Sequence, residues 1–304
     1  MKIAVISGSP KGRDSATLRY VRFLQLNYPQ VEFQIEHVGQ QIGKLEKNKA
    51  FFDSLIDRIK EADAVLWATP VYYLVVPSQL KRFIELVFER DKSAAFSDKP
   101  AASLTTSIHF FDHTAVRYLH AVSEDLGMHY GGSYTAEMND LRRPREKRRL
   151  LSFGKIMLAC FEKGFAAPYC RTYPPSPAGS FVYQPEKPGA KIDPAGKKIV
   201  IVADLENTSA NLAKMVEHFR ESFTKSPELI NLAERNIKLG CRGCLACGAE
   251  NHCFYEKRDS FRNLFEDKVK KAHILIIAGE IKDRFLSARI KRFMDRSFYM
   301  NHVP

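Results

Sequence analysis

The chain opens with Met1-Lys2-Ile3-Ala4-Val5-Ile6-Ser7-Gly8-Ser9-Pro10-Lys11, and this stretch decides the fold. Residues 2–7 are a short apolar segment of the kind that forms a buried strand, and a turn rich in Gly, Ser and Pro follows. Leucines and a valine at helical spacing come next. The chain therefore begins with a strand, a turn and a helix.

The same alternation continues along the first half of the chain. Further strands are expected at residues 31–38, 64–68, 101–106 and 131–134, and further helices at 51–60, 78–88, 115–126 and 145–164. Strands that alternate with helices pair in parallel through right-handed crossovers. The pattern predicts an α/β fold, a doubly wound parallel five-stranded sheet.

The second half repeats the first. Residues 198–203 mirror residues 2–7, and residues 291–293 match residues 81–83. We predict a first domain at 1–165, a proline-rich linker at 166–197, and a partial second copy of the fold at 198–304. Only 11 residues follow Phe293, so we expect a fragment of a longer protein rather than strands supplied from elsewhere.

Composition excludes several classes of protein. With 304 residues, 45% hydrophobic and 27% charged, the chain is expected to be globular, cytoplasmic and without a membrane partner. The net charge is +12, and the densest basic run lies at residues 142–149. We interpret this run as the solvated start of an amphipathic helix and expect no nucleic-acid partner, because no nucleic-acid motif accompanies it.

Four of the six cysteines crowd into thirteen residues of the second copy. They are Cys241, Cys244, Cys247 and Cys253. Their compact spacing would let one loop wrap a 4Fe-4S cluster, and the second Cys-x-x-Cys pair of a typical zinc site is missing. Zinc, and free or disulfide-forming thiols, stay open as alternatives. The other two cysteines, Cys160 and Cys170, are isolated.

Two loops of the first copy carry candidate binding residues. The turn at residues 8–17 is rich in Ser, Thr and Gly, and it precedes a helix start, which favours an anion. Lys11 and Arg13 add positive charge. The stretch at residues 69–83 runs from the end of the third strand into the helix at 78–88. Its loop, called the tyrosine loop here, is stiffened by two prolines and offers the adjacent Tyr72 and Tyr73 to an aromatic ligand.

Together these motifs resemble the NADPH-dependent FMN reductase and iron–sulfur flavoprotein family, which has a flavodoxin-like fold, over residues 1–165. The resemblance implies FMN as cofactor. The phosphate would be held by Ser9, Lys11, Ser15, Ala16 and Thr17. The isoalloxazine would be lined by Pro70, Val71, Tyr72 and Tyr73, and by the loop at 105–113, which includes Thr106, Ser107 and His109. A flavin-edge or substrate role for His109 or His113 is a hypothesis.

The second copy departs from this pattern. Its counterpart of the tyrosine loop is Gly279 to Asp283, and its counterpart of the phosphate loop, residues 204–209, has gained two acids. We therefore expect little or no FMN binding there. The spacing of the four cysteines also resembles that of the iron–sulfur flavoproteins, in which flavin loop and cysteine loop share one domain.

The resemblance implies a flavin-dependent oxidoreductase that passes electrons between FMN and the cysteine-ligated cluster, with NAD(P)H or a redox protein as transient donor. No catalytic acid or base is nominated. Family relatives are homodimers, so a homo-oligomer or an intramolecular pseudo-dimer is expected. The alternatives are a non-catalytic flavodoxin-like electron carrier and a zinc- or thiol-based redox sensor.

Overall fold

A computed structural model of the chain describes residues 1–163, 171–174, 181–186, 189–205, 210–248 and 252–298. The chain divides into two compact units. The first comprises Met1–Pro175 together with Cys241–Gly243, and the second comprises Ser176–Gly240 together with Cys244–Pro304. The predicted linker and Cys170 lie partly or wholly outside the described residues, and the predicted domain boundaries stay a prediction.

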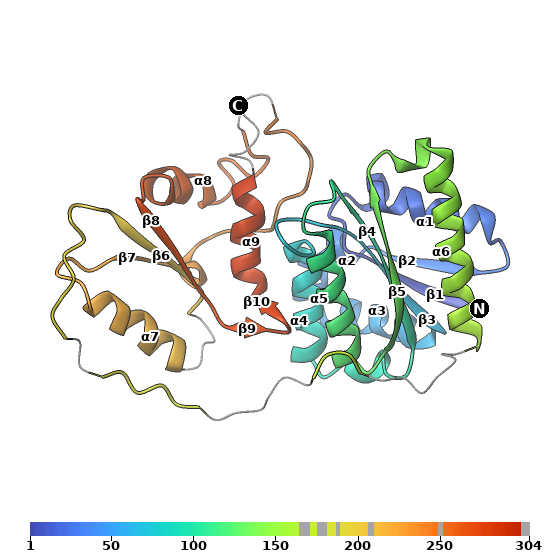
Figure 1. Cartoon of the computed structure of the whole chain (residues 1–304), viewed down its shortest axis with the longest axis horizontal. Coiled ribbons are helices and arrows are strands. Elements are labelled where there is room, and N and C mark those ends of the chain that lie inside the picture. Colours follow the sequence, from blue (N-terminus) through green and yellow to red (C-terminus); the bar gives the residue numbers. More distant parts are fainter. Residues whose placement is uncertain (164–170, 175–180, 187–188, 206–209, 249–251, 299–304) are drawn as a thin grey trace. The chain divides into compact units, whose positions relative to one another are not determined.

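The first unit is built on a five-stranded sheet (Figure 1). The strands are β1 (Lys2–Ser7), β2 (Glu32–Glu36), β3 (Ala64–Pro70), β4 (Pro100–Ser107) and β5 (His129–Glu137). They pair in parallel in the order β2-β1-β3-β4-β5, which is the flavodoxin-like order. The predicted fold class is confirmed.

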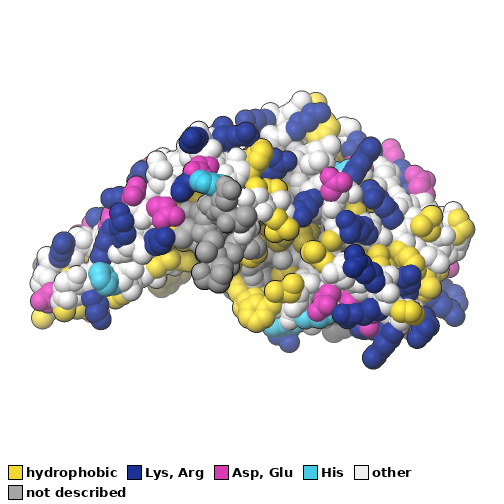
Figure 2. Space-filling view, turned by 90° about the horizontal axis from the view of Figure 1, so that it is seen from above, with side chains coloured by type: hydrophobic (Ala, Val, Ile, Leu, Met, Phe, Trp, Pro, Cys, Tyr) yellow, Lys and Arg dark blue, Asp and Glu magenta, His cyan; other side chains and the backbone are white. Residues whose placement is uncertain are grey.

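Helices connect these strands. They are α1 (Ala16–Asn27), α2 (Val38–Lys47), α3 (Lys49–Glu61), α4 (Ser78–Glu89), α5 (Asp112–Asp125) and α6 (Pro144–Lys163). Buried residues of α1 and α6, such as Leu24 and Leu150, share one core cluster with β1, β3 and β4. Helix α2 was not expected from the sequence, whereas the other helices lie close to their predicted positions. Lys and Arg side chains spread over much of the surface seen in Figure 2.

Strand β3 lies at the centre of the first unit. Its residues 64–69 are all buried, because the strand is paired on both edges and covered on both faces. Trp67, the single tryptophan of the chain, is fully buried here. Its Nε1 donates a hydrogen bond to Ser123 Oγ at 3.0 Å, and its ring stacks on Phe96. Its fluorescence therefore reports the folding of the first unit alone.

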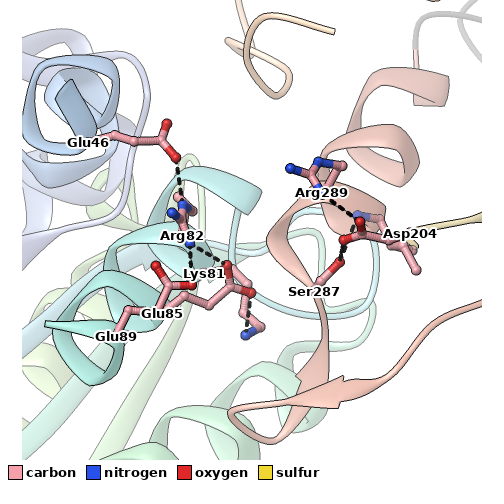
Figure 3. Close-up of polar contacts among 9 residues, drawn as sticks. Glu46, Lys81, Arg82, Glu85, Glu89, Asp204, Ser287 and Arg289 are labelled. Atoms are coloured by element: carbon pink, nitrogen blue, oxygen red, sulfur yellow. Dashed lines mark hydrogen bonds and ion pairs between the residues drawn. The ribbon is translucent and has the colours of Figure 1, made fainter. Parts of the chain in front are cut away.

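Ion pairs hold α4 in place (Figure 3). Lys81 Nζ lies 3.0 Å from Glu85 Oε1, and both side chains are almost fully buried. Arg82 reaches Glu46 on α2 at 2.8 Å and Glu89 at 2.9 Å. Although burial disfavours its charge, the hydrogen bonds to Glu89 and Glu46 raise the pKa of Arg82 further above its usual value. Of these contacts, the pair of Arg82 with Glu46 joins α4 to α2, and the other two lie within α4.

The second unit holds a smaller parallel sheet. Its strands are β6 (Ile199–Ala203), β7 (Glu228–Asn231) and β8 (Ile274–Ala278), in the order β7-β6-β8. This order repeats β2-β1-β3 of the first unit. Its helices are α7 (Ala210–Glu221), α8 (Phe261–Leu264) and α9 (Ala288–Arg296), and a hairpin is formed by β9 (Ile281–Lys282) and β10 (Phe285–Leu286).

Two local features show that the second unit repeats the first in structure. In the first unit Tyr73 and Leu74 have positive φ angles of 34° and 79°, and 210 residues later Asp283 and Arg284 have 44° and 69°. The buried Lys81–Glu85 pair of α4 recurs in α9. No helix among the described residues is both long enough and apolar enough to cross a bilayer.

Gly39 allows α2 to approach the turn after β1. A Cβ at this position would clash with the backbone carbonyl of Gly8. We expect Gly39→Ala to lower the free energy of unfolding of the first unit by about 1–3 kcal/mol, since backbone cannot yield as a flexible side chain can. Urea unfolding followed by Trp67 fluorescence measures this. Gly189→Ala, where an added Cβ meets nothing within 4 Å, is the control, and equal midpoints for both variants would contradict the packing argument.

Candidate functional site

The turn after β1 brings hydroxyl groups to the start of α1. The backbone N–H of Gly8 donates to the carbonyl of Ala68 at 2.9 Å, which fixes the turn against the end of β3. Ser15 caps α1 and accepts a hydrogen bond from the backbone N–H of Leu18 at 3.4 Å. Ser9 and Thr17 are buried beside it. The turn thus combines hydroxyls with the positive end of a helix dipole.

A direct contact joins this turn to β4. Thr17 Oγ1 lies 2.6 Å from Thr106 Oγ1, and both residues are buried although 89 positions separate them in the sequence. The predicted phosphate residue Thr17 and the predicted ring residue Thr106 therefore meet at the carboxyl edge of the sheet. Ligands of open α/β sheets bind at this edge.

The tyrosine loop after β3 is held in a defined conformation. Val71 N–H donates to the carbonyl of Thr106 at 2.9 Å, and Tyr72 N–H donates to the carbonyl of Val75 at 2.8 Å. Tyr73 and Leu74 lie between these contacts and have positive φ angles, which residues other than glycine rarely adopt. The tip of the loop therefore stores strain, and Tyr73 stays exposed at 48%.

The loop after β4 completes the same edge. His109 N–H donates to Ser107 Oγ at 2.8 Å, and His109 Nδ1 lies 3.0 Å from Asp112 Oδ2 at the start of α5. His109 and Phe111 both have positive φ angles. Asp112 was not singled out from the sequence, although its position three residues after His109 is the local signal that could have found it. His113 Nδ1 lies farther from Asp112, at 3.9 Å.

The donors of this edge fit a phosphorylated ligand. Ser7 Oγ and Thr105 Oγ1, near the carboxyl ends of β1 and β4, are buried hydroxyls without a hydrogen-bond partner among the described residues. Lys11 lies in the same turn as the buried Ser9, whose Oγ accepts a hydrogen bond from Lys11 N–H at 3.3 Å. Hydroxyl donors, a cation and a helix N-terminus are the groups that bind phosphate in proteins.

The residues from Cys241 to Cys253 are called the cysteine segment here. Its first three residues group with the first unit. Gln79 Nε2, at the start of α4, donates to the carbonyl of Cys241 at 3.1 Å. Gly243 has a φ of 61°, and a Cβ there would clash with Tyr72 Oη. Gln79 and Gly243 were not expected to take part from the sequence. Their contacts bring the backbone of Cys241–Gly243 against the tyrosine loop.

The other three cysteines of the segment lie in the second unit. Burial raises the pKa of the Cys247 thiol, and the nearby Cys253 and Cys244 raise it further. The Cys247 thiol therefore interacts electrostatically with each of the other two thiols. Among the described residues, however, no group of three or more His, Cys, Asp or Glu side chains is arranged to hold a metal ion.

In the second unit, side chains of the protein itself contact the start of the turn after β6, which corresponds to the turn after β1 (Figure 3). Asp204, which follows β6, accepts hydrogen bonds from Ser287 Oγ and Arg289 Nη1, each at 2.5 Å. Gly8 stands at this place in the first unit, where no carboxylate is present. Residues 206–209 of the turn lie outside the described residues. An internal carboxylate at this position would repel a phosphate.

Comparison with known proteins agrees with this geometry for the first unit. Residues 1–139 match the family model described as NADPH-dependent FMN reductase. The expected resemblance to that family is confirmed over these residues. The FMN-dependent NADH:quinone oxidoreductase of Vibrio vulnificus (strain YJ016) is 35% identical over 63 residues, which are 19% of this chain and 32% of that protein. The match thus spans about a third of that relative's length.

Solved structures with similarity to the chain include an NADH:FMN oxidoreductase, EMOB, in its apo form, with a TM-score of 0.44 and 21% identity, covering 56% of this chain and 93% of that one. Another is FerB, an NAD(P)H:(acceptor) oxidoreductase from Paracoccus denitrificans, with a TM-score of 0.37 and 20% identity, covering 52% and 97%. A third is general stress protein 14 from Treponema denticola in complex with FMN, with a TM-score of 0.40 and 13% identity, covering 51% and 98%.

His109 stabilises the ionised form of Asp112. Burial disfavours that form, but hydrogen bonds from the His109 ring and the His113 backbone N–H outweigh burial and hold the pKa of Asp112 below its usual value. The pair therefore stabilises the loop above the unfolded-state pKa of about 3.9, and this stability is lost as the pH falls through the lower folded pKa. We expect His109→Ala to raise the pKa of Asp112, measured by carboxyl NMR titration. His113→Ala keeps the backbone N–H and is the control; an unchanged pKa in His109→Ala would contradict the assignment.

Proposed function

We propose that the first unit, whose residues 1–139 match the NADPH-dependent FMN reductases, binds FMN at the carboxyl edge of its sheet and acts as an NAD(P)H-dependent flavin oxidoreductase. The observation that carries the proposal is the 2.6 Å contact between Thr17 and Thr106, which joins the turn after β1 to the end of β4. Three loops that are far apart in sequence meet there, as a mononucleotide site requires.

The turn after β1 would hold the phosphate. Ser9, Ser15 and Thr17 supply hydroxyls, Ala16 supplies a backbone N–H at the first position of α1, and Lys11 supplies charge. These groups are fixed before ligand arrives, since Ser15 caps the helix and Thr17 contacts Thr106. A preformed site loses less conformational freedom on binding, which strengthens affinity.

The two neighbouring loops would hold the ring. Pro70, Val71, Tyr72 and Tyr73 would line it on one side, and Thr106, Ser107 and His109 on the other. FMN, when bound, would accept a hydride from NAD(P)H and return electrons singly or in pairs to an acceptor. The His109 ring, held by Asp112 at 3.0 Å, would orient a donor or acceptor near the flavin edge. No catalytic acid or base follows from these contacts.

The second unit would bind no FMN. What supports this is the ion pair of Asp204 with Arg289 and the replacement of the tyrosines by Lys282 and Asp283. One chain would then carry one flavin. That the two copies pair with each other, or that chains form homo-oligomers, stays a prediction.

Removing the Thr17 hydroxyl tests the proposed phosphate site. We expect Thr17→Val to weaken FMN binding roughly 10- to 100-fold, since a hydrogen bond to a charged group contributes about 1.5–3 kcal/mol. Flavin fluorescence titration of the apo-protein gives the dissociation constant. Thr17→Ser keeps the hydroxyl and should bind nearly as the wild type does. Asn211→Ala changes the corresponding position of the second copy and should have no effect.

Two results would contradict this proposal. Unchanged FMN affinity in Thr17→Val would remove the assigned phosphate site. Stoichiometric flavin without steady oxidation of NADPH or NADH in the presence of a soluble acceptor would instead favour a non-catalytic electron carrier.

We separately propose that the cysteine segment binds a 4Fe-4S cluster when iron and sulfide are supplied. The spacing of the four cysteines supports this, as does the electrostatic interaction among Cys244, Cys247 and Cys253. Cys241 groups with the first unit and the other three cysteines with the second, and residues 249–251 of the segment lie outside the described residues. The proposed flavin reaction includes no step at this cluster.

Metal analysis of protein prepared without oxygen tests the cluster. We expect about four iron atoms and four acid-labile sulfides per chain, since a 4Fe-4S cluster is held by four thiolates. Cys247→Ser should abolish both, and Cys160→Ser, which lies outside the segment, should change neither. Zinc in place of iron, or four titratable thiols without metal, would contradict the cluster and leave the flavin proposal untouched.

A further inference from the structure

A groove of about 540 Å³ lies between β5 and α6 of the first unit, away from the proposed flavin edge. Residues 131–134 of β5 form one wall, and α6 forms the other. Ser133 and Tyr134 pair with Ser103 and Leu104, ahead of Thr106 in β4. Strand β5 is the last strand of its sheet and pairs only with β4 among the described residues, so its outer edge has no strand partner there, although the register with β4 shifts between Ala101 and Ser103. We call this the β5–α6 groove.

One end of the β5–α6 groove is strongly basic. Arg145, Arg148 and Arg149 line it from the first turns of α6, and all three are exposed. Arg149 pairs with Glu146 at 2.6 Å, whereas Arg145 and Arg148 have no ion pair within the part of the chain that the structure describes. Cations three and four residues apart, at the positive end of a helix dipole, destabilise a helix. An external anion bound to Arg145 and Arg148 would relieve this repulsion.

The other end of the groove is apolar. Phe153, Ile156 and Met157 line it, and Ile156 is 61% exposed. Gly132 of β5 has open space where a side chain would stand. On α6 the mean position of the three arginines lies eight residues before the mean position of the three apolar residues, which is about 12 Å along the helix. About four residues of an extended strand span this distance.

We propose that the β5–α6 groove binds an extended acidic segment of a partner protein, which adds as a strand to the free edge of β5. Carboxylates of that segment would pair with Arg145 and Arg148, and an apolar side chain about four residues away would pack against Phe153 and Ile156. A peptide is favoured over a nucleotide or nucleic acid because only a peptide satisfies the backbone edge and the apolar end together. This site does not depend on the proposed flavin chemistry.

Fluorescence anisotropy with the full chain tests the proposal. The probe is a fluorescein-labelled peptide with glutamates at alternate positions followed by leucines at alternate positions. We expect saturable binding that weakens with salt and is roughly tenfold or more weaker in the Arg145→Gln/Arg148→Gln double variant, since both charge-assisted contacts are lost. Lys155→Gln removes an exposed cation from the same helix outside the groove and should bind as the wild type does.

A second probe separates strand addition from simple charge attraction. The same peptide with N-methylated backbone positions cannot donate hydrogen bonds, and on the wild-type chain it should bind much more weakly. This arm does not depend on the folding of any variant. Equal binding of the methylated peptide, unchanged affinity in the double variant that keeps native Trp67 fluorescence, or tighter binding of tripolyphosphate or a single-stranded oligonucleotide than of the acidic peptide would each overturn the proposal.

Discussion

The constraint on which the first unit depends is the parallel pairing of β1 between β2 and β3. Parallel pairing sends the carboxyl ends of all five strands to one edge, so the loops after β1, β3 and β4 must meet there. The contact between Thr17 and Thr106 and the hydrogen bond from Val71 to Thr106 then fasten the three loops together. The proposed flavin site follows from this arrangement, because no single loop holds all its groups.

The second unit repeats part of the scaffold and differs at the positions of the proposed site. Its strand order repeats β2-β1-β3, and its hairpin turn repeats the two positive φ angles of the tyrosine loop. Yet Asp204 accepts hydrogen bonds from Ser287 and Arg289, whereas the corresponding residue of the first unit, Gly8, has no side chain. Strand β8 also exposes Ile274, Leu275 and Ile277 at 40–43%, whereas the matching residues of β3 are fully buried. Shared topology therefore does not carry shared chemistry.

The sequence predicts the parts of this fold that depend on local pattern. The apolar runs of β1, β3 and β6 and the repeat were readable because buried parallel strands need continuous apolar residues. Helix α2 was missed because Gly39 and Gly43 lower its helix propensity, although Val38, Ile42 and Leu45 are buried at helical spacing. Tertiary packing outweighs propensity in this helix.

The sequence shows the residue types of the candidate site but not the contacts between its loops. Hydroxyl-rich turns can be recognised from sequence, but the 89 residues between Thr17 and Thr106 hide their contact. The regular spacing of the cysteines suggests one compact group, yet positive φ angles at Gly243 and Leu245 turn the backbone between them, and Cys241 groups with the first unit. The spacing of the cysteines shows only that they are near in sequence. Whether their side chains lie close together depends on the backbone conformation.

We propose that the first copy of the fold binds FMN and that the second copy does not. Calorimetric titration of the flavin-free full chain with FMN measures this most directly, because it counts sites without reference to turnover. We expect a single site per chain, which is lost in a variant that carries Thr17→Val and Thr106→Val together. Two sites per chain, or one site that survives both substitutions, would contradict it.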